Sequence, residues 1–420
     1  MKYAIYPILG LLLLGCSTNT PEIIADRDNG GLQLPQGFSA LIVADSIGSA
    51  RHLVVDDNGV IYVSLRERKN GGGIVRLADT DKDGRADEIG YFGACQGTGI
   101  ELYDNFLYFG TDTSVIRFPF GEGDRPSETF ETIVEGYPLE YQHATKTFCM
   151  DTIGNVYVNV GAPSNACAEQ DRAPGSPGMD PCPILEIYGG IWQYSASQLG
   201  QVHMQDGKRF ATGIRNAVAI QWNYHVNELY VVQHGRDQLH PQYKENFTSE
   251  ENADLPSEEF FLVEEGDDFG WPYCYHDPFS NKKVLAPEYG GDGELVGRCE
   301  NMKDPFMSFP AHYAPNDLLF YEGDMFPERY RHGAFVAFHG SWNRSPQMQE
   351  GFNVVFVPFD GKYNSGDWEV FADNFAGIDP VPSAGDAQHR PCGLAVGPDG
   401  SLYVVDSKWG RIWRIFYTGE

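Results

Sequence analysis

The sequence predicts an all-β protein folded as a six-bladed β-propeller. Its 420 residues include 48 glycines, 26 prolines and 13% aromatic residues, a composition typical of turn-rich β-proteins. A phrase of turn residues followed by an apolar, tyrosine-rich strand recurs at six places, residues 57–63, 103–109, 153–158, 226–232, 331–337 and 398–405. Because one such unit cannot bury both faces of its own sheet, we expect the units to pack radially around an axis.

The first 16 residues resemble the signal peptide of a bacterial lipoprotein. Lys2 precedes a mostly apolar stretch, residues 3–14, that is too short to persist as a membrane-spanning helix, and Gly15 precedes Cys16. We expect Cys16 to be lipidated and Ser17, where aspartate would retain the protein in the inner membrane, to favour the outer membrane. An ordinary signal peptide with an incidental cysteine is the alternative. Residues 17–33 are polar with no apolar period, which predicts a flexible tether.

The propeller is expected to span residues 34–420. Residues 38–43 precede the first copy of the repeat and favour a strand that closes the ring with the C-terminal strands. Apolar strands precede most copies and often follow them, as at residues 52–55 and 74–77. Two β-sandwiches are the alternative fold, but they predict no repeated phrase.

An acidic loop follows the first copy. Carboxylates stand at its positions one, three, five and nine, namely Asp79, Asp81, Asp83 and Asp87. Gly84 at position six completes the spacing that wraps Ca²⁺, whereas Gly90 at position twelve replaces the usual glutamate, so the loop is no complete EF-hand. A structural Ca²⁺ is one interpretation, and a solvated acidic turn is the other.

The cysteines predict two disulfides, because nearby pairs in loops usually join in an exported protein. The expected pairs are Cys167 with Cys182 and Cys274 with Cys299. Cys95, Cys149 and Cys392 then leave an odd number, which predicts at least one buried free thiol.

The formal net charge of −29 argues against nucleic-acid binding, and an anionic cofactor would need a local basic pocket. Four residues stand at comparable positions, 6 to 11 residues before copies of the repeat, namely Arg51, His143, Arg215 and Arg390. In a propeller these entry points converge on one mouth of the channel. A histidine can act there as a general base, and the arginines can bind an anion. Separate local salt bridges are the alternative.

Residues 213–237 predict a hairpin whose polar ends, Arg215-Asn216 and residues 233–237, emerge on the same side. Residues 238–330 carry long polar and proline-rich loops, which we expect to build a binding face rather than a new domain.

Several phrases, taken in order, resemble the soluble quinoprotein sugar dehydrogenases, especially the sorbosone and pyranose dehydrogenase branch. That family consists of six-bladed propellers that hold pyrroloquinoline quinone (PQQ). The phrases are 142–143 (QH), 164–167 (SNAC), 213–216 (GIRN), 233–237 (QHGRD), 266–272 (GDDFGWP), 338–344 (FHGSWNR) and 390–394 (RPCGL). The resemblance covers residues 34 to about 416.

The resemblance implies that His143 takes the hydroxyl proton of a sugar while a hydride passes to the quinone. It implies that Arg215 and Asn216 bind the reactive quinone oxygens. It also implies that backbone carbonyls of Gly235 and Arg236 ligate a Ca²⁺ that binds the cofactor.

Contacts to the cofactor carboxylates are implied for Arg390 and, by its equivalent offset, for Arg51. Where glucose-oxidising members use a lysine, this chain reads Trp342-Asn343-Arg344, and we assign Arg344 to that task. Trp342, or His312-Tyr313, is expected to stack on the quinone, with a packed channel aromatic as the alternative. His234 replaces a glutamine beside the calcium carbonyls, and Glu258-Glu259 is interpreted as structural support.

The sequence therefore predicts an exported, lipid-anchored quinoprotein that oxidises a sugar or a related alcohol or aldehyde. Its electrons would pass to a separate acceptor, such as a cytochrome or a quinone. A lactonase-type hydrolase on the same fold is one rival, although it would need a channel metal held by acidic or amide side chains. A catalytically silent binding propeller is the other rival, because fold alone does not imply activity.

Overall fold

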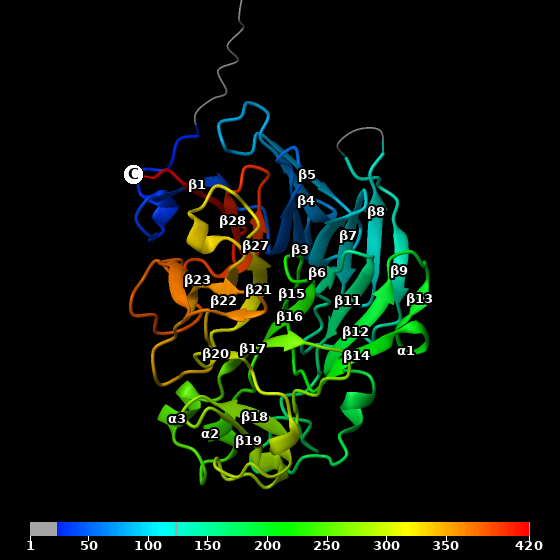
Figure 1. Ribbon diagram of the computed structural model, residues 1–420, viewed down its shortest axis with the longest axis vertical. Coiled ribbons are helices and arrows are strands. Elements are labelled where there is room, and N and C mark those ends of the chain that lie inside the picture. Colours follow the sequence, from blue (N-terminus) through cyan, green and yellow to red (C-terminus); the bar gives the residue numbers. More distant parts are fainter. Residues whose placement is uncertain (1–22, 122–124, 420) are drawn as a thin grey trace, which may run out of the picture.

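Six sheets form the body of the molecule, as the computed structural model shows for residues 23–121 and 125–419 (Figure 1). The first three sheets, each given from the axis outward, are β2(Ala50–Val55), β3(Ile61–Lys69), β4(Gly72–Ala78), β5(Glu88–Phe92); β6(Gly97–Tyr103), β7(Phe106–Thr111), β8(Val115–Pro119), β9(Glu131–Glu135), β13(Gln201–Val202); and β10(Phe148–Met150), β11(Asn155–Val160), β12(Gly190–Ser195), β14(Lys208–Thr212). The other three are β15(Ala219–Asn223), β16(Glu228–Gln233), β17(Glu258–Val263), β20(Met307–Phe309); β21(Pro315–Phe320), β22(Ala334–His339), β23(Phe352–Val357), β26(Glu369–Ala372); and β27(Pro391–Val396), β28(Leu402–Asp406), β29(Ile412–Tyr417), β1(Phe38–Ala44).

The repeated phrase coincides with the second strand of every blade, from β3 to β28, so the predicted six-bladed propeller is confirmed. The innermost strands β2, β6, β10, β15, β21 and β27 contact one another in order around a closed ring. The predicted closing strand is also confirmed, because β1 pairs with β29 from Phe38 opposite Tyr417 to Ala44 opposite Ile412. Closure in this way removes the free edge that an open sheet would expose.

The hydrophobic core is divided among the blade interfaces. Six main clusters of buried side chains lie between successive blades, such as Tyr62 with Phe109 between the first and second. Phe335 and Trp413 belong to the cluster between the fifth and the last. Each blade therefore depends on both neighbours for burial of its faces, which is the physical reason that the repeat predicts a ring.

Part of the predicted tether packs against the propeller. Gln33 pairs with Asp373, Asp26 accepts a hydrogen bond from the backbone of Ile42 at 2.8 Å, and the indole of Trp413 donates to Gly30 at 3.0 Å. The folded unit thus begins before residue 34. The predicted signal peptide, residues 1–16, lies outside the described residues. Among the described residues, no helix has the length and apolar character needed to cross a membrane.

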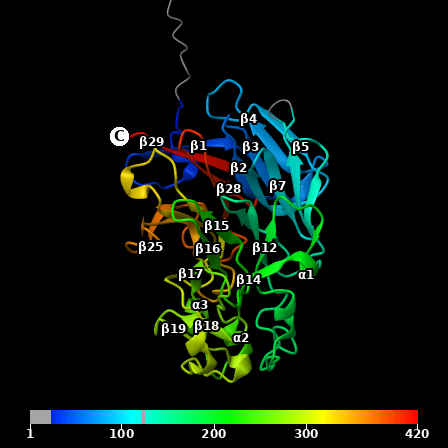
Figure 2. The same ribbon diagram turned by 45° about the vertical axis from the view of Figure 1, so that its right-hand side comes forward.

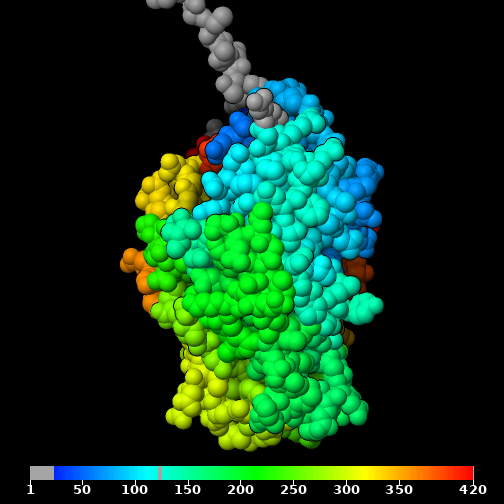
Figure 3. Space-filling view, turned by 90° about the vertical axis from the view of Figure 1, so that its right-hand side faces the viewer, coloured from blue at the N-terminus to red at the C-terminus, as the bar shows by residue number. Residues whose placement is uncertain are grey.

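Two long insertions form what we call the insertion lobe. The first is residues 162–189, and the second comprises residues 238–257 and 264–306, which flank β17. The lobe projects from one end of the molecule, where its two parts lie side by side (Figure 2 and Figure 3). Arg298 pairs with Asp180 at 2.9 Å across them. The lobe contains η2(Pro183–Glu186), α2(Leu239–Gln242), α3(Ser249–Asp254), β18(Cys274–Asp277), β19(Lys282–Leu285), η3(Pro287–Tyr289) and η4(Gly297–Asn301). The remaining short elements are η1(Asn29–Gly31), α1(His203–Asp206), η5(Glu328–Tyr330), β24(Phe359–Asp360) and β25(Tyr363–Asn364).

Both predicted disulfides are present in this lobe. They join Cys167 to Cys182 and Cys274 to Cys299, each stapling one insertion. The three remaining described cysteines, Cys95, Cys149 and Cys392, are free, and the last two are buried as predicted.

Candidate functional site

A cavity of about 460 Å³ opens at the end of the channel where the blade-entry loops meet. Its lining includes eight of the residues singled out from the sequence, namely Arg51, His143, Arg215, Asn216, His234, Gly235, Trp342 and Arg390. The predicted convergence of residues from four blades on one mouth is therefore observed. His312 also lines this cavity.

Two assigned side chains, those of Arg344 and Asn343, do not line the cavity. Arg344 instead donates to the Ala253 carbonyl at 2.6 Å and lies near Glu350 at 3.3 Å. Asn343 is buried, with its carbonyl accepting from Asn252. Arg236 was assigned through its backbone carbonyl, and its side chain pairs with buried Glu288. Arg344 and Asn343 were misassigned because Ala253 and Asn252, which they contact, come from the insertion lobe, whose path the sequence does not reveal.

His143 occupies the loop between β9 and β10 with a left-handed backbone, φ 51°. Its Nδ1 donates to the Ala162 carbonyl at 2.5 Å, so the tautomer that makes this bond leaves Nε2 as an acceptor. Burial, and after it the charge of Arg215, lowers the pKa of His143 to about 3. Gly161 makes the approach possible, because a Cβ there would lie 2.7 Å from both the His143 Cβ and the Asn216 Oδ1. The site holds a neutral base in a strained position.

Arg215 is buried and almost fully bonded. Its guanidinium donates to the Asn165 carbonyl at 3.2 Å, the Asn165 Oδ1 at 3.1 Å, the Gly235 carbonyl at 2.9 Å and Asp237 at 2.8 Å. These four bonds leave one of its five N–H groups for a ligand. Arg172 also donates to Asp237, at 3.1 Å. Burial alone would raise the pKa of Asp237. The two arginines help lower this pKa to about 2, so the carboxylate stays charged.

Arg51 and Arg390 face the cavity, and neither guanidinium forms an ion pair with an acid among the described residues, although the Arg390 backbone donates to Asp406 at 2.7 Å. Arg390 donates to the His339 and Gly340 carbonyls at 2.8 and 2.6 Å, whereas the buried Nε of Arg51 has no hydrogen-bond partner among the described residues. Burial, followed by the charge of Arg51, lowers the pKa of Arg390 to about 10. Two neighbouring guanidinium groups without an ion pair, in a protein of net charge −29, form a site for an anion.

Sequence reasoning missed two acids that line the cavity, Asp237 and Glu258. Asp237 ends the quoted phrase 233–237, and its position after the hairpin was the available signal. Glu258 was interpreted as structural support, and it does accept from the Gly235 and Ala314 backbones at 2.6 and 3.0 Å. Burial raises the pKa of Glu258 to about 8. The adjacent His234 has an unbonded Nδ1, and burial followed by Arg215 lowers its pKa to about 4.

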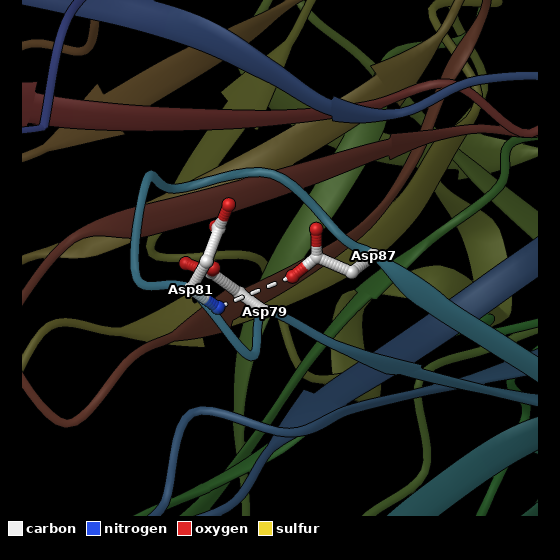
Figure 4. Close-up of side chains that lie close together, drawn as sticks. All are labelled: Asp79, Asp81 and Asp87. Atoms are coloured by element: carbon white, nitrogen blue, oxygen red, sulfur yellow. Dashed lines mark hydrogen bonds between the residues drawn. The ribbon is translucent and has the colours of Figure 1, made fainter.

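The acidic loop lies elsewhere, between β4 and β5 (Figure 4). Carboxylate oxygens of Asp79, Asp81 and Asp87 approach within 4.8 Å of one another, the one such group found in the described part of the chain. Asp83 is not part of this group and instead accepts from the Arg85 backbone at 2.8 Å. Hydrogen bonds from Thr80 lower the pKa of Asp87. The loop thus gathers three of the four predicted ligands, and Ca²⁺ there stays a prediction.

Comparisons with known proteins agree with this architecture. An uncharacterised protein of Borreliella burgdorferi is 27% identical over 209 residues, 49% of this chain and 48% of that protein. The PQQ-dependent pyranose dehydrogenase of Coprinopsis cinerea is 33% identical over 170 residues, 35% of this chain and 22% of that enzyme. The chain thus spans less than half the length of either relative.

Among solved structures, a Trichoderma reesei member of carbohydrate-active enzyme family AA12 superposes with a TM-score of 0.73 at 18% identity, covering 95% of this chain and all of that one. The holo PQQ domain of the Coprinopsis cinerea pyranose dehydrogenase gives 0.71 at 18% identity, covering 95% and 99%. At this identity, the structures support the fold. The family model described as TrAA12-like matches residues 32–418, which confirms the resemblance found in the sequence. The chain belongs to the TrAA12-like family.

Proposed function

We propose that this protein oxidises a sugar or a sugar-derived alcohol or aldehyde with PQQ held in the cavity, and that a separate carrier accepts the electrons. One observation carries the proposal. Arg51 and Arg390, whose guanidinium groups form no ion pair among the described residues, lie in the same cavity as the neutral base His143 and Arg215, which has one unbonded N–H group. An anionic quinone that needs a base beside it fits this set. The similarity to proteins named as PQQ-dependent pyranose dehydrogenases supports the choice of cofactor.

The cofactor, when bound, supplies the quinone that accepts a hydride from the sugar carbon. Arg51 and Arg390 would hold its carboxylates. The remaining N–H of Arg215 and the Nδ2 of Asn216 would donate to its oxygens, because the Oδ1 of Asn216 already accepts from Asn159 at 3.1 Å. The Nε2 of His143 would take the substrate hydroxyl proton, which its low pKa permits at neutral pH.

Calcium would bind at the wall formed by Gly235 and Glu258. The carbonyl of Gly235 keeps a lone pair beside the one that Arg215 uses, and the Glu258 carboxylate is bonded to the Gly235 backbone at 2.6 Å. Such hard oxygen donors suit Ca²⁺. Arg236 would contribute only through its backbone carbonyl, because its side chain is turned to Glu288.

We also propose that the protein is exported and anchored by a lipid on Cys16. Globomycin treatment, or the Cys16→Ser variant, is expected to move the protein from the membrane fraction or to leave its precursor unprocessed. Unchanged fractionation of that variant together with unchanged processing would contradict the anchor.

The test of the catalytic proposal is reconstitution. Apo-protein is mixed with PQQ, Ca²⁺, a panel of aldoses and sugar-derived aldehydes, and a dye that accepts electrons. We expect dye reduction that requires both PQQ and a sugar. Hydrolysis of a lactone without PQQ would support the hydrolase instead, and the absence of both PQQ binding and turnover would support a binding propeller.

A further inference from the structure

Asn165 links the insertion lobe to the cavity. It is 1% exposed and lies in the first insertion, 50 residues before Arg215. Its backbone carbonyl accepts from Arg215 at 3.2 Å and from the indole of Trp271 at 2.9 Å. Its Oδ1 accepts from Arg215 at 3.1 Å and from the Asp237 backbone at 2.9 Å, and its Nδ2 donates to the Asp237 carbonyl at 2.8 Å. Each of these three polar atoms of Asn165 therefore finds its hydrogen-bond partners in Arg215, Asp237 or Trp271.

This set of contacts fixes the orientation of a guanidinium. Arg215 also donates to Gly235 and Asp237, so its plane is held from the hairpin side and from the lobe side at once. Without Asn165, only the hairpin contacts would remain. The ion pair with Asp237 alone would leave the side-chain torsions of Arg215 free to adjust. Hydrogen bonds on a second edge of the same planar guanidinium remove that freedom.

The lobe in turn holds Asn165 in place. The Asp171 carboxylate accepts from the Ser164 hydroxyl at 2.7 Å and from the Asn165 backbone at 2.9 Å. Ser164 accepts from the Cys167 backbone at 2.9 Å, and Cys167 is joined to Cys182. Asn165 thus sits on a stapled turn rather than on a free loop.

We propose that Asn165 is a positioning residue of the reaction, whose carboxamide and carbonyl hold Arg215 so that its one unbonded N–H faces the cavity. This inference rests on the proposed function for what Arg215 does, but the geometric claim stands apart from it. Asn165 is absent from the cavity lining, so it acts through Arg215.

The test compares Asn165→Leu with Asn223→Leu. Asn223 is equally buried at 1% exposed, accepts from the His225 backbone at 3.0 Å, and lies at the far end of the same hairpin. We expect kcat of the reconstituted Asn165→Leu enzyme to fall on the order of 10²-fold, the cost of a misplaced catalytic group, with KM for the sugar nearly unchanged. Asn165→Asp, which keeps the acceptor oxygen, is expected to recover part of kcat. Asn223→Leu is expected to lower stability only.

The pH dependence of kcat/KM provides a measurement that a purely structural role of Asn165 would leave unchanged. The charge of Arg215 helps keep the pKa of His143 low. If Arg215 swings away, the acid limb of kcat/KM should move to higher pH in Asn165→Leu and stay in place in Asn223→Leu.

A crystal structure of the Asn165→Leu apo-protein decides the geometric claim without any turnover. We expect Arg215 to leave its wild-type position. An unmoved guanidinium, or a kcat loss no larger than that of Asn223→Leu in an active background, would overturn the inference. An inactive wild-type protein would contradict the proposed function instead. The crystal structure would still test whether Asn165 holds Arg215 in place.

Discussion

Replacing Arg51 with methionine is expected to change the stability of the apo-protein and its affinity for PQQ in opposite directions. The variant keeps a side chain of similar length but removes one of two neighbouring cations. The pKa of Arg390 is lowered from 12.5 to about 10, which corresponds to roughly 3 kcal/mol against its charged form at about 1.4 kcal/mol per pKa unit. Burial is the larger cause and Arg51 the second, so the relief on removing Arg51 is on the order of 1 kcal/mol.

The expected loss of binding free energy for PQQ is larger than this gain in stability. A hydrogen bond from a cation to a carboxylate contributes about 1.5–3 kcal/mol, so PQQ should bind roughly 10- to 150-fold more weakly to Arg51→Met. Thermal unfolding of the apo-protein measures the first effect, and titration with PQQ in the presence of Ca²⁺ measures the second.

Arg414→Met provides the matched control. Arg414 on β29 is buried, but its guanidinium donates to Asp399 at 2.6 Å, and it lies outside the cavity lining. Its removal should lower the unfolding temperature and leave PQQ affinity unchanged. The reasoning is refuted if Arg51→Met destabilises the apo-protein as Arg414→Met does, or if it binds PQQ with wild-type affinity.

Three further predictions concern the base, its support and the acidic loop. His143→Gln should retain PQQ but lose about 10²- to 10⁴-fold in kcat, the usual contribution of a general base, and an unchanged kcat would remove His143 from that role. Gly161→Ala should fold and lose activity, because its Cβ would lie 2.7 Å from the His143 Cβ, and full activity in steady-state assays would show that the loop yields. Asp79→Asn should abolish any rise in unfolding temperature that Ca²⁺ gives the PQQ-free protein, as followed by thermal scans with and without chelator; an equal rise in the variant would place the ion elsewhere.

The blade count was predictable because it depends on a local pattern. The turn and the alternating strand of each repeat are contiguous in sequence, and burial of both sheet faces requires neighbours of the same kind. The pairing of Cys167 with Cys182 and of Cys274 with Cys299 was predictable for a similar reason, since each pair closes a short loop.

The convergence of Arg51, His143, Arg215 and Arg390 was predictable as well, because all four lie at or shortly before the innermost strand of a blade, and these entry points reach the same end of a propeller. Arg344 stands two residues after Trp342, which does line the cavity, yet it turns to Ala253 and Glu350. Its direction depends on where α3 packs, and α3 lies in an insertion with no counterpart in the other blades.

By itself, the sequence determined the architecture, the end of the channel that carries the site, and the cationic character of that site, because these follow from periodicity and from residue type. Only the tertiary structure decided which of the charged groups are bonded to one another and which are left for a ligand. Asn165 reaches Arg215 across 50 residues, and Asp237 joins the two, through contacts that depend on how two insertions fold against a hairpin. Partners so distant in sequence leave no local pattern, since each bond is set by the packing of both segments.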